Sequence, residues 1–194
     1  MMTKLEVLLQ SPDVPAGSFA AKPKVIYRAG NRYCRIEEQP DAERGIQGLL
    51  IVNEPDYWMA NLLTKTAQHG VDSGPTFVCH MPMFVDGDKP AEGAADGLGN
   101  LEFGLEFEYF KGRKAAAQKG PILQGKQTTS YPVKVGTAAF SLFTYGTPER
   151  PLAVARVQGD KNEIYWYSGY GHVPFDPRLF AKPTGLKIEE SKSQ

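Results

Sequence analysis

The chain lacks a long hydrophobic run and has no excess of charge of either sign. Its longest aliphatic run, residues 49–52, has the length of a short strand, whereas a membrane helix needs about 20 apolar residues. The 22 basic and 22 acidic residues balance, which argues against a nucleic-acid-binding protein because such proteins need a basic surface. Residues 1–9 also lack the apolar stretch of a signal peptide. The sequence therefore predicts no transmembrane segment and no nucleic-acid partner.

Metal-binding signatures are also scarce. The chain has three histidines, His69, His80 and His172. His69 and Asp72 could in principle meet His80 and its neighbouring cysteine, but zinc ligands usually come in recognisable close pairs. We therefore expect hydrogen-bonded or solvated histidines and no metal site.

No activated nucleophile stands out. The motif Gly-x-Ser-x-Gly does not occur, and Ser141 and Ser168 lie in apolar or aromatic runs. Cys79 precedes His80, but neighbouring residues of a strand point to opposite faces. Residues 120–127 nearly match the phosphate-binding loop Gly-x4-Gly-Lys-Ser/Thr, but glutamine takes the last position, and the strand and helix that should flank the loop come in reverse order. We expect no catalytic residue and no cofactor.

Glycine and proline are plentiful, with 20 and 15 residues. They indicate many turns between short strands. A chain of 194 residues is most simply one domain, 1–194, with a core that needs no metal or disulfide. The segment 86–99 is rich in glycine, aspartate and alanine and predicts a flexible loop, and 191–194 predicts a frayed tail.

The two cysteines, Cys34 and Cys79, lie in strand-like runs. They would form one disulfide in an exported protein and remain buried thiols in a cytosolic one. We favour buried thiols from the sequence.

β-branched and aromatic residues predict a series of short strands. Residues 24–28 and 32–38 form a hairpin around a Gly-Asn turn, and 4–10 is a strand or a helix remnant. Short connections favour antiparallel pairing. The other predicted strands are 48–53, 57–63, 65–72, 76–81, 131–135, 138–144, 152–158, 163–170 and 186–189.

Residues 101–118 interrupt the strands. Apolar side chains recur there every three or four residues, Asn100 is a plausible N-cap, and acidic residues come early and basic ones late. Alternation over 101–109 suits a strand as well, and Gly104 and Gly112 weaken the helix. We favour a helix.

Aromatic side chains occur in nearly every predicted element, and ordinary core packing explains most of them. A sheet covered by a single helix can also leave an apolar cavity. Residues 165–167 are all aromatic and must line both faces of their strand, which favours a groove or a partner surface. The candidate ligand-binding residues are Tyr27, Tyr33, Trp58, Phe77, Phe103, Phe107, Phe110, Phe140 and Trp166.

Four segments carry a resemblance to a known family: the Pro-Lys-apolar entry at 22–27, residues 53–58, the helix at 101–118 and the closing Phe/Pro/Gly strand at 175–188. In this order they resemble the bacterial periplasmic lipoprotein-carrier superfamily (LolA/LolB-like). The resemblance implies a mainly β (α+β) fold: a curved antiparallel sheet or incomplete β-barrel with one main helix on its concave side.

The resemblance also implies an exported, non-enzymatic protein that binds or carries an apolar or amphipathic ligand, such as an acyl chain, a lipid or a lipoprotein. The family's single cavity arginine has three possible counterparts, Arg28, Arg32 and Arg35. The implied location is the periplasm, with the cytoplasm as the alternative.

Two other functions stay open at this stage. The first is a structural envelope protein that binds a partner through its sheet edge or the aromatic strand 165–170. The second, less favoured, is a hydrolase or metal-dependent enzyme.

Overall fold

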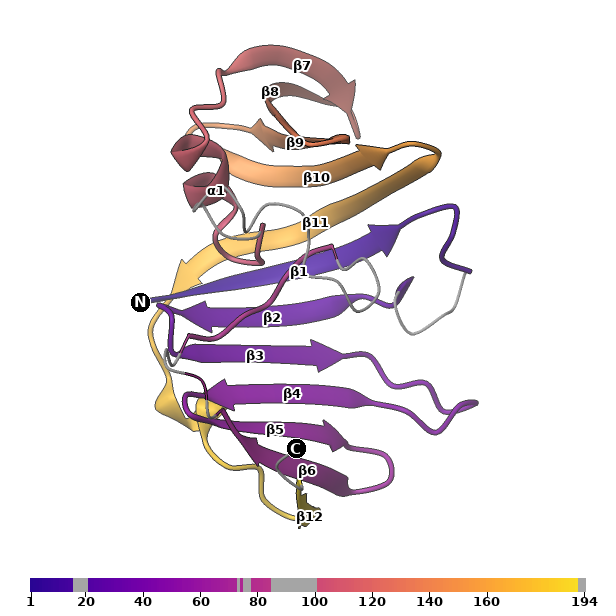
Figure 1. Cartoon of the computed structure of the whole chain (residues 1–194), viewed down its shortest axis with the longest axis vertical. Coiled ribbons are helices and arrows are strands. Elements are labelled where there is room, and N and C mark those ends of the chain that lie inside the picture. The colour runs from indigo at the N-terminus through magenta and orange to yellow at the C-terminus, as the bar shows by residue number, and fades with distance from the viewer. Residues whose placement is uncertain (16–20, 73, 75–77, 85–100, 192–194) are drawn as a thin grey trace. The chain divides into compact units, whose positions relative to one another are not determined.

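A computed structural model describes residues 1–15, 21–72, 74, 78–84 and 101–191. The fold is mainly β, with a single twelve-stranded sheet that is not closed into a barrel (Figure 1). The described residues contain one α-helix, α1 (Glu106–Gly112). This confirms the prediction of a mainly β, open sheet with one main helix.

The twelve strands are numbered in chain order. They are β1 (Met2–Gln10), β2 (Lys24–Ala29), β3 (Tyr33–Glu38), β4 (Gly48–Asn53), β5 (Asp56–Asn61), β6 (Thr66–Val71), β7 (Gln118–Leu123), β8 (Lys126–Val135), β9 (Ala138–Tyr145), β10 (Arg150–Gln158), β11 (Lys161–Val173) and β12 (Lys187–Glu190). A short 3-10 helix, η3 (Pro177–Phe180), precedes β12.

The strand order in the sheet is β12-β6-β5-β4-β3-β2-β1-β11-β10-β9-β8-β7. Neighbours from β2 to β6 and from β7 to β11 pair antiparallel, as short connections require. The closing strand β12 instead pairs parallel with β6, because residues 174–186 carry the chain back to the start of β6 before it pairs.

The chain packs as two compact units. Unit 1 comprises 1–6, 23–81 and 171–194, and unit 2 comprises 7–22 and 82–170. The single domain expected over 1–194 stays a prediction.

In unit 1 the C-terminal segment covers one face of the sheet. A buried cluster of Leu49, Ile51 and Trp58 packs against Ile188 of β12. Phe180 of η3 is fully buried, and its ring lies 5.3 Å from that of Tyr33. The apolar side chains that point to this side of β3, β4 and β5 are thus buried in the core of unit 1.

In unit 2 helix α1 packs on β9 and β11. The ring of Tyr109 lies 6.3 Å from that of Phe140 in β9, and Phe110 is only 1% exposed. Phe103, just before the helix, meets Tyr165 of β11 edge to face at 5.0 Å. Aromatic side chains therefore fill the space beneath the helix.

The predicted helix 101–118 was too long at both ends. Gly104 (φ +83°) and Lys114 (φ +55°) adopt left-handed conformations that an α-helix does not accept, so the helix spans only Glu106–Gly112. Leu105 is its N-cap, and the predicted cap Asn100 lies outside the described residues.

Two further expectations need correction. Residues 78–81 form no strand, and Cys34 and Cys79 are joined in a disulfide rather than free thiols, with their Cα atoms 6.3 Å apart. The disulfide explains the missing strand, because it fixes 78–81 against a face of β3 rather than at an edge of the sheet. The predicted loop 86–99 and the end of the tail, 192–194, lie outside the described residues.

Both edges of the sheet carry features that discourage pairing with another strand. In β7, Pro121 lacks an N–H, and the pairing with β8 is irregular between Lys119 and Ile122. At the other edge, β12 is only four residues long, and three of its residues are charged.

Candidate apolar binding face of unit 1

The side chains of β2 to β6 divide between two faces according to strand register. Tyr33, Ile51 and Trp58 point to the face that the C-terminal segment covers. Their neighbours in the strands point to the opposite face. We call the opposite face the open face.

A row of apolar side chains crosses the open face at right angles to the strands. Ile26 of β2 lies opposite Ile36 of β3, Ile36 opposite Leu50 of β4, and Leu50 opposite Met59 of β5. We call these four residues the apolar row. In β6, Gln68 lies opposite Met59 and ends the row.

Exposure increases from one end of the apolar row to the other. Ile26 is fully buried, Ile36 and Leu50 are half-buried, and Met59 is 50% exposed. A half-exposed Met beside half-buried Ile and Leu leaves apolar surface in contact with water.

Polar groups border the row on one side. Lys24 and Glu38 face each other across β2 and β3, with Lys24 Nζ 3.5 Å from Glu38 Oε1. Burial lowers the pKa of Lys24, although Glu38 acts in the opposite direction. On β5 and β6, Asn61 and Thr66 continue this border.

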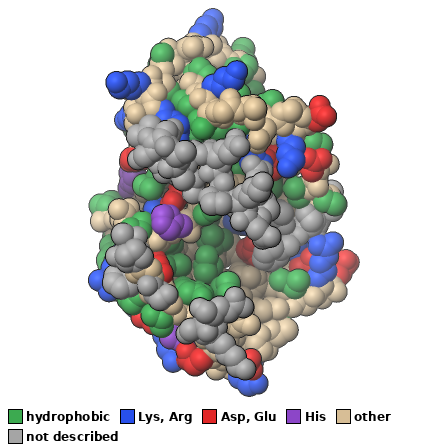
Figure 2. Space-filling view, in the orientation of Figure 1, with side chains coloured by type: hydrophobic (Ala, Val, Ile, Leu, Met, Phe, Trp, Pro, Cys, Tyr) green, Lys and Arg blue, Asp and Glu red, His purple; other side chains and the backbone are tan. Residues whose placement is uncertain are grey.

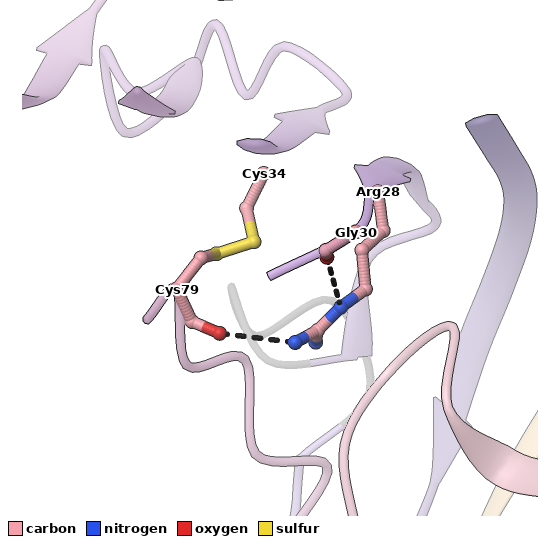
Figure 3. The surroundings of a disulfide bond; sticks show 4 residues. All are labelled: Arg28, Gly30, Cys34 and Cys79. Carbon is pink, nitrogen blue, oxygen red and sulfur yellow. Dashed lines mark hydrogen bonds between the residues drawn. A yellow bond between two sulfur atoms is a disulfide. The ribbon is translucent and has the colours of Figure 1, made fainter. Parts of the chain in front are cut away.

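The disulfide forms the border on the other side (Figure 3). Arg28 and Val52 flank Cys34 in register, so the bond to Cys79 rises from the open face. The Arg28 guanidinium donates to the carbonyl of Cys79 at 3.0 Å and to that of Gly30 at 3.3 Å. Of the three candidate arginines, Arg28 is therefore the one on the open face, and it is 3% exposed.

This border continues over β5 and β6. Tyr57 lies opposite Gly70, and its ring occupies the space that any side chain at that position would need. Gly70 therefore permits Tyr57 to lie flat against the sheet.

The open face is turned toward the viewer in Figures 1 and 2, because the chain that carries Cys79 passes in front of the sheet in Figure 1. Figure 2 shows a hollow over β2 to β4 with hydrophobic side chains inside it.

The predicted ligand-binding residues of unit 1 lie away from this row. Tyr27, Tyr33 and Trp58 all point to the face that the C-terminal segment covers. Tyr33 packs on Phe175 and Phe180, and Trp58 belongs to the buried cluster. Phe77 lies outside the described residues.

The remaining predicted residues belong to unit 2. Phe103, Phe110 and Phe140 are all buried: Phe110 lies in helix α1, Phe103 packs on Tyr165, and Phe140 packs on Tyr109 of the helix. Phe107 is half-buried, and its ring lies 6.4 Å from that of Tyr170. Trp166 points to the other face of β11 from Tyr165 and donates to Gln10 Oε1 at 2.8 Å.

Sequence reasoning missed the apolar row because it searched for aromatic side chains. A signal was present for part of the row: Ile36 lies between Arg35 and Glu37 in the predicted hairpin, and Leu50 lies in the next strand. The register that aligns them with Met59 depends on turn geometry, which residue types alone did not specify.

A buried carboxyl group lies within the aromatic packing of unit 2. Glu106 is fully buried and its Oε1 accepts from the Tyr167 hydroxyl at 2.7 Å and from the Gly104 N–H at 2.9 Å. Its Oε2 has no hydrogen-bond partner among the residues that the structure describes. Burial raises the pKa of Glu106, only partly opposed by these two donors, and burial raises the pKa of Tyr167 as well.

Two of the residues considered for catalysis or metal binding, Cys79 and His69, take part in structural contacts. Cys79 is in the disulfide and has no thiol to act as a nucleophile. His69 contacts Asp56 and Glu190, and among the described residues no group of three His, Cys, Asp or Glu side chains could hold a metal ion. The near match to a phosphate loop is the hairpin between β7 and β8, with strands on both sides. No helix in the described part of the chain has the length and apolar character to cross a membrane.

Comparison with known proteins bears on the fold. No protein-family model matches the chain. No curated protein matches it significantly either. A solved structure of an uncharacterized conserved protein from Thermus thermophilus is similar, with 12% identity and a TM-score of 0.52 over 98% of this chain and 91% of that one.

A LolA superfamily protein from Nitrosomonas europaea also matches, with 10% identity and a TM-score of 0.38 over 93% of this chain and 89% of that one. The chain is thus weakly similar to a LolA superfamily protein, and membership of that family stays a prediction. Similarity this low carries no ligand and no residue role across, so function depends on the site itself.

Proposed function

We propose that the protein binds an apolar or amphipathic ligand on the open face of unit 1, as an exported carrier of an acyl chain, a lipid or a lipoprotein. The observation that carries this proposal is the apolar row, whose Ile36, Leu50 and Met59 remain partly exposed. Covering such a surface with an alkyl chain is favourable by about 25 cal/mol per Å² of apolar area removed from water.

The disulfide supports export. Disulfides persist in oxidising compartments and are rare in the cytosol, and Cys34 and Cys79 are 0% and 1% exposed. The bond also holds residues 78–81 against the open face, where it forms one border of the row.

The alternative of a protein partner has less support. Tyr165 and Tyr167 of the aromatic strand are buried within unit 2, and Pro121 and the irregular pairing of β7 discourage strand addition at that edge. No described feature favours a hydrolase.

Native mass spectrometry of protein purified without detergent tests the proposal. We expect bound apolar molecules in the wild type and their loss in Leu50→Gln, because a polar side chain then interrupts the row. Val71→Gln is the matched control, since Val71 is 58% exposed and lies on the other face.

Circular dichroism should show that both variants fold. A wild-type protein that carries no ligand and takes up no fatty acid when mixed with it would contradict the proposal.

A further inference from the structure

We infer that the open face takes one linear alkyl chain, lying across the strands, with contact for about eight to ten carbons. This inference rests on the proposed function and specifies its ligand. The evidence is the width, length and closed end of the apolar row.

The width of the row admits a single chain. Residues on the same face of a strand are about 7 Å apart along it, and on β2 and β3 side chains occupy the next positions on each side of the row. Lys24 and Glu38 stand on one side, and the disulfide with Arg28 on the other. A fused ring system or two parallel chains would have to displace one of these borders.

The direction of the ligand follows from the same borders. Along β3 and β5, a border residue lies two positions from the apolar side chain of the open face: Glu38 follows Ile36, and Tyr57 precedes Met59. Across the strands, apolar contact is continuous from Ile36 through Leu50 to Met59.

The length follows from strand spacing. Ile36 and Met59 lie on strands two intervals apart, which is about 10 Å, and the side chains at both ends extend this contact to about eight to ten carbons. Fully buried Ile26 offers no further surface and closes the row at β2. Gln68, which is exposed, leaves the β6 end open for a polar head group.

Straight-chain carboxylic acids of about 6 to 14 carbons, kept below micelle formation, provide the test by isothermal titration calorimetry. We expect affinity to rise about fourfold per methylene and to level off near ten carbons. In Met59→Gln the row loses one strand interval, about 5 Å, so the plateau should begin about four carbons earlier. Met59 is half exposed, so this variant should fold.

Val157→Gln is the control, because Val157 is 46% exposed and lies in unit 2. It should leave the plateau unchanged. Affinity that rises through the longest acid, or a Met59→Gln variant that weakens all acids equally without moving the plateau, would overturn the crosswise geometry. Absence of binding by every acid would instead overturn the proposed function, and this inference with it.

Discussion

His69 has a carboxylate at each of its ring nitrogens. Nε2 lies 2.8 Å from Asp56 Oδ1, and Nδ1 lies 2.6 Å from Glu190 Oε2. Only the protonated ring has two N–H groups to donate, and the bonds to Asp56 and Glu190 raise the pKa of His69 above its usual 6.5. The ring also stacks on Trp58 at 5.2 Å. The protonated form therefore ties β12 to the sheet.

The stability that protonated His69 contributes should fall as the pH rises. A raised histidine pKa contributes stability that is full below the unfolded value and is lost as pH rises through the folded one. As the pH rises, deprotonation of His69 should lower the melting temperature of the wild type by no more than about 2 to 4 °C. The melting temperature of His69→Gln should not show this decrease. Differential scanning calorimetry from about pH 6 to about pH 9 measures it. Equal slopes in both proteins would refute the role of His69.

The buried Glu106 depends on Tyr167. Tyr167→Phe removes one of the two donors to Oε1 and leaves a buried polar atom less satisfied, which should lower the free energy of unfolding by about 1 to 3 kcal/mol. Tyr165→Phe is a suitable control, since Tyr165 lies on the same face of β11 and is also buried, and it should cost less than Tyr167→Phe. Urea denaturation distinguishes them, and equal losses would count against the Glu106 contact.

Among the elements, the strands were more predictable than the helix. Period-2 alternation located β2, β3, β4 and β9 within a residue or two, because half-buried strands repeat the signal along their length. Helix α1 has only seven residues, and its boundaries are set by left-handed residues and by packing of Phe103 on Tyr165. Neither is visible in hydrophobic spacing.

The cysteine pairing was beyond sequence reasoning for a similar reason. Cys34 and Cys79 are 45 residues apart in sequence, and both runs looked like strands. Only a non-strand conformation of 78–81 brings the second cysteine over the face of β3. The candidate site was predictable in its apolar character, but its location needed the register of four strands.

The disulfide should contribute strongly to stability. Closing a loop of this length removes about 4 kcal/mol of unfolded-state entropy in the chain-entropy model. We expect the double variant Cys34→Ala, Cys79→Ala to unfold at lower guanidinium concentration by an amount within about 2 to 5 kcal/mol. With excess reductant, the stability of the wild type should approach that of the variant. A variant as stable as the oxidised wild type would show that the disulfide does not stabilise the protein.

At the scale of the whole chain, composition and turn frequency sufficed for the fold class. Glycine and proline indicated many short strands, and short connections indicated antiparallel neighbours. The parallel pairing of β12 with β6 escaped notice, because the segment that reverses the chain, 174–186, has no periodic pattern. Sequence patterns describe local structure well and return paths poorly.

The two ends of the sheet have a consequence for storage and production of the protein. A sheet that is open rather than closed offers two places where molecules could stack into fibrils, and long, flat, apolar edges would favour such growth. Here one end presents a proline within an irregular pairing and the other a four-residue strand with three charges. The molecule can thus leave the apolar row partly exposed and still resist polymerising through its backbone.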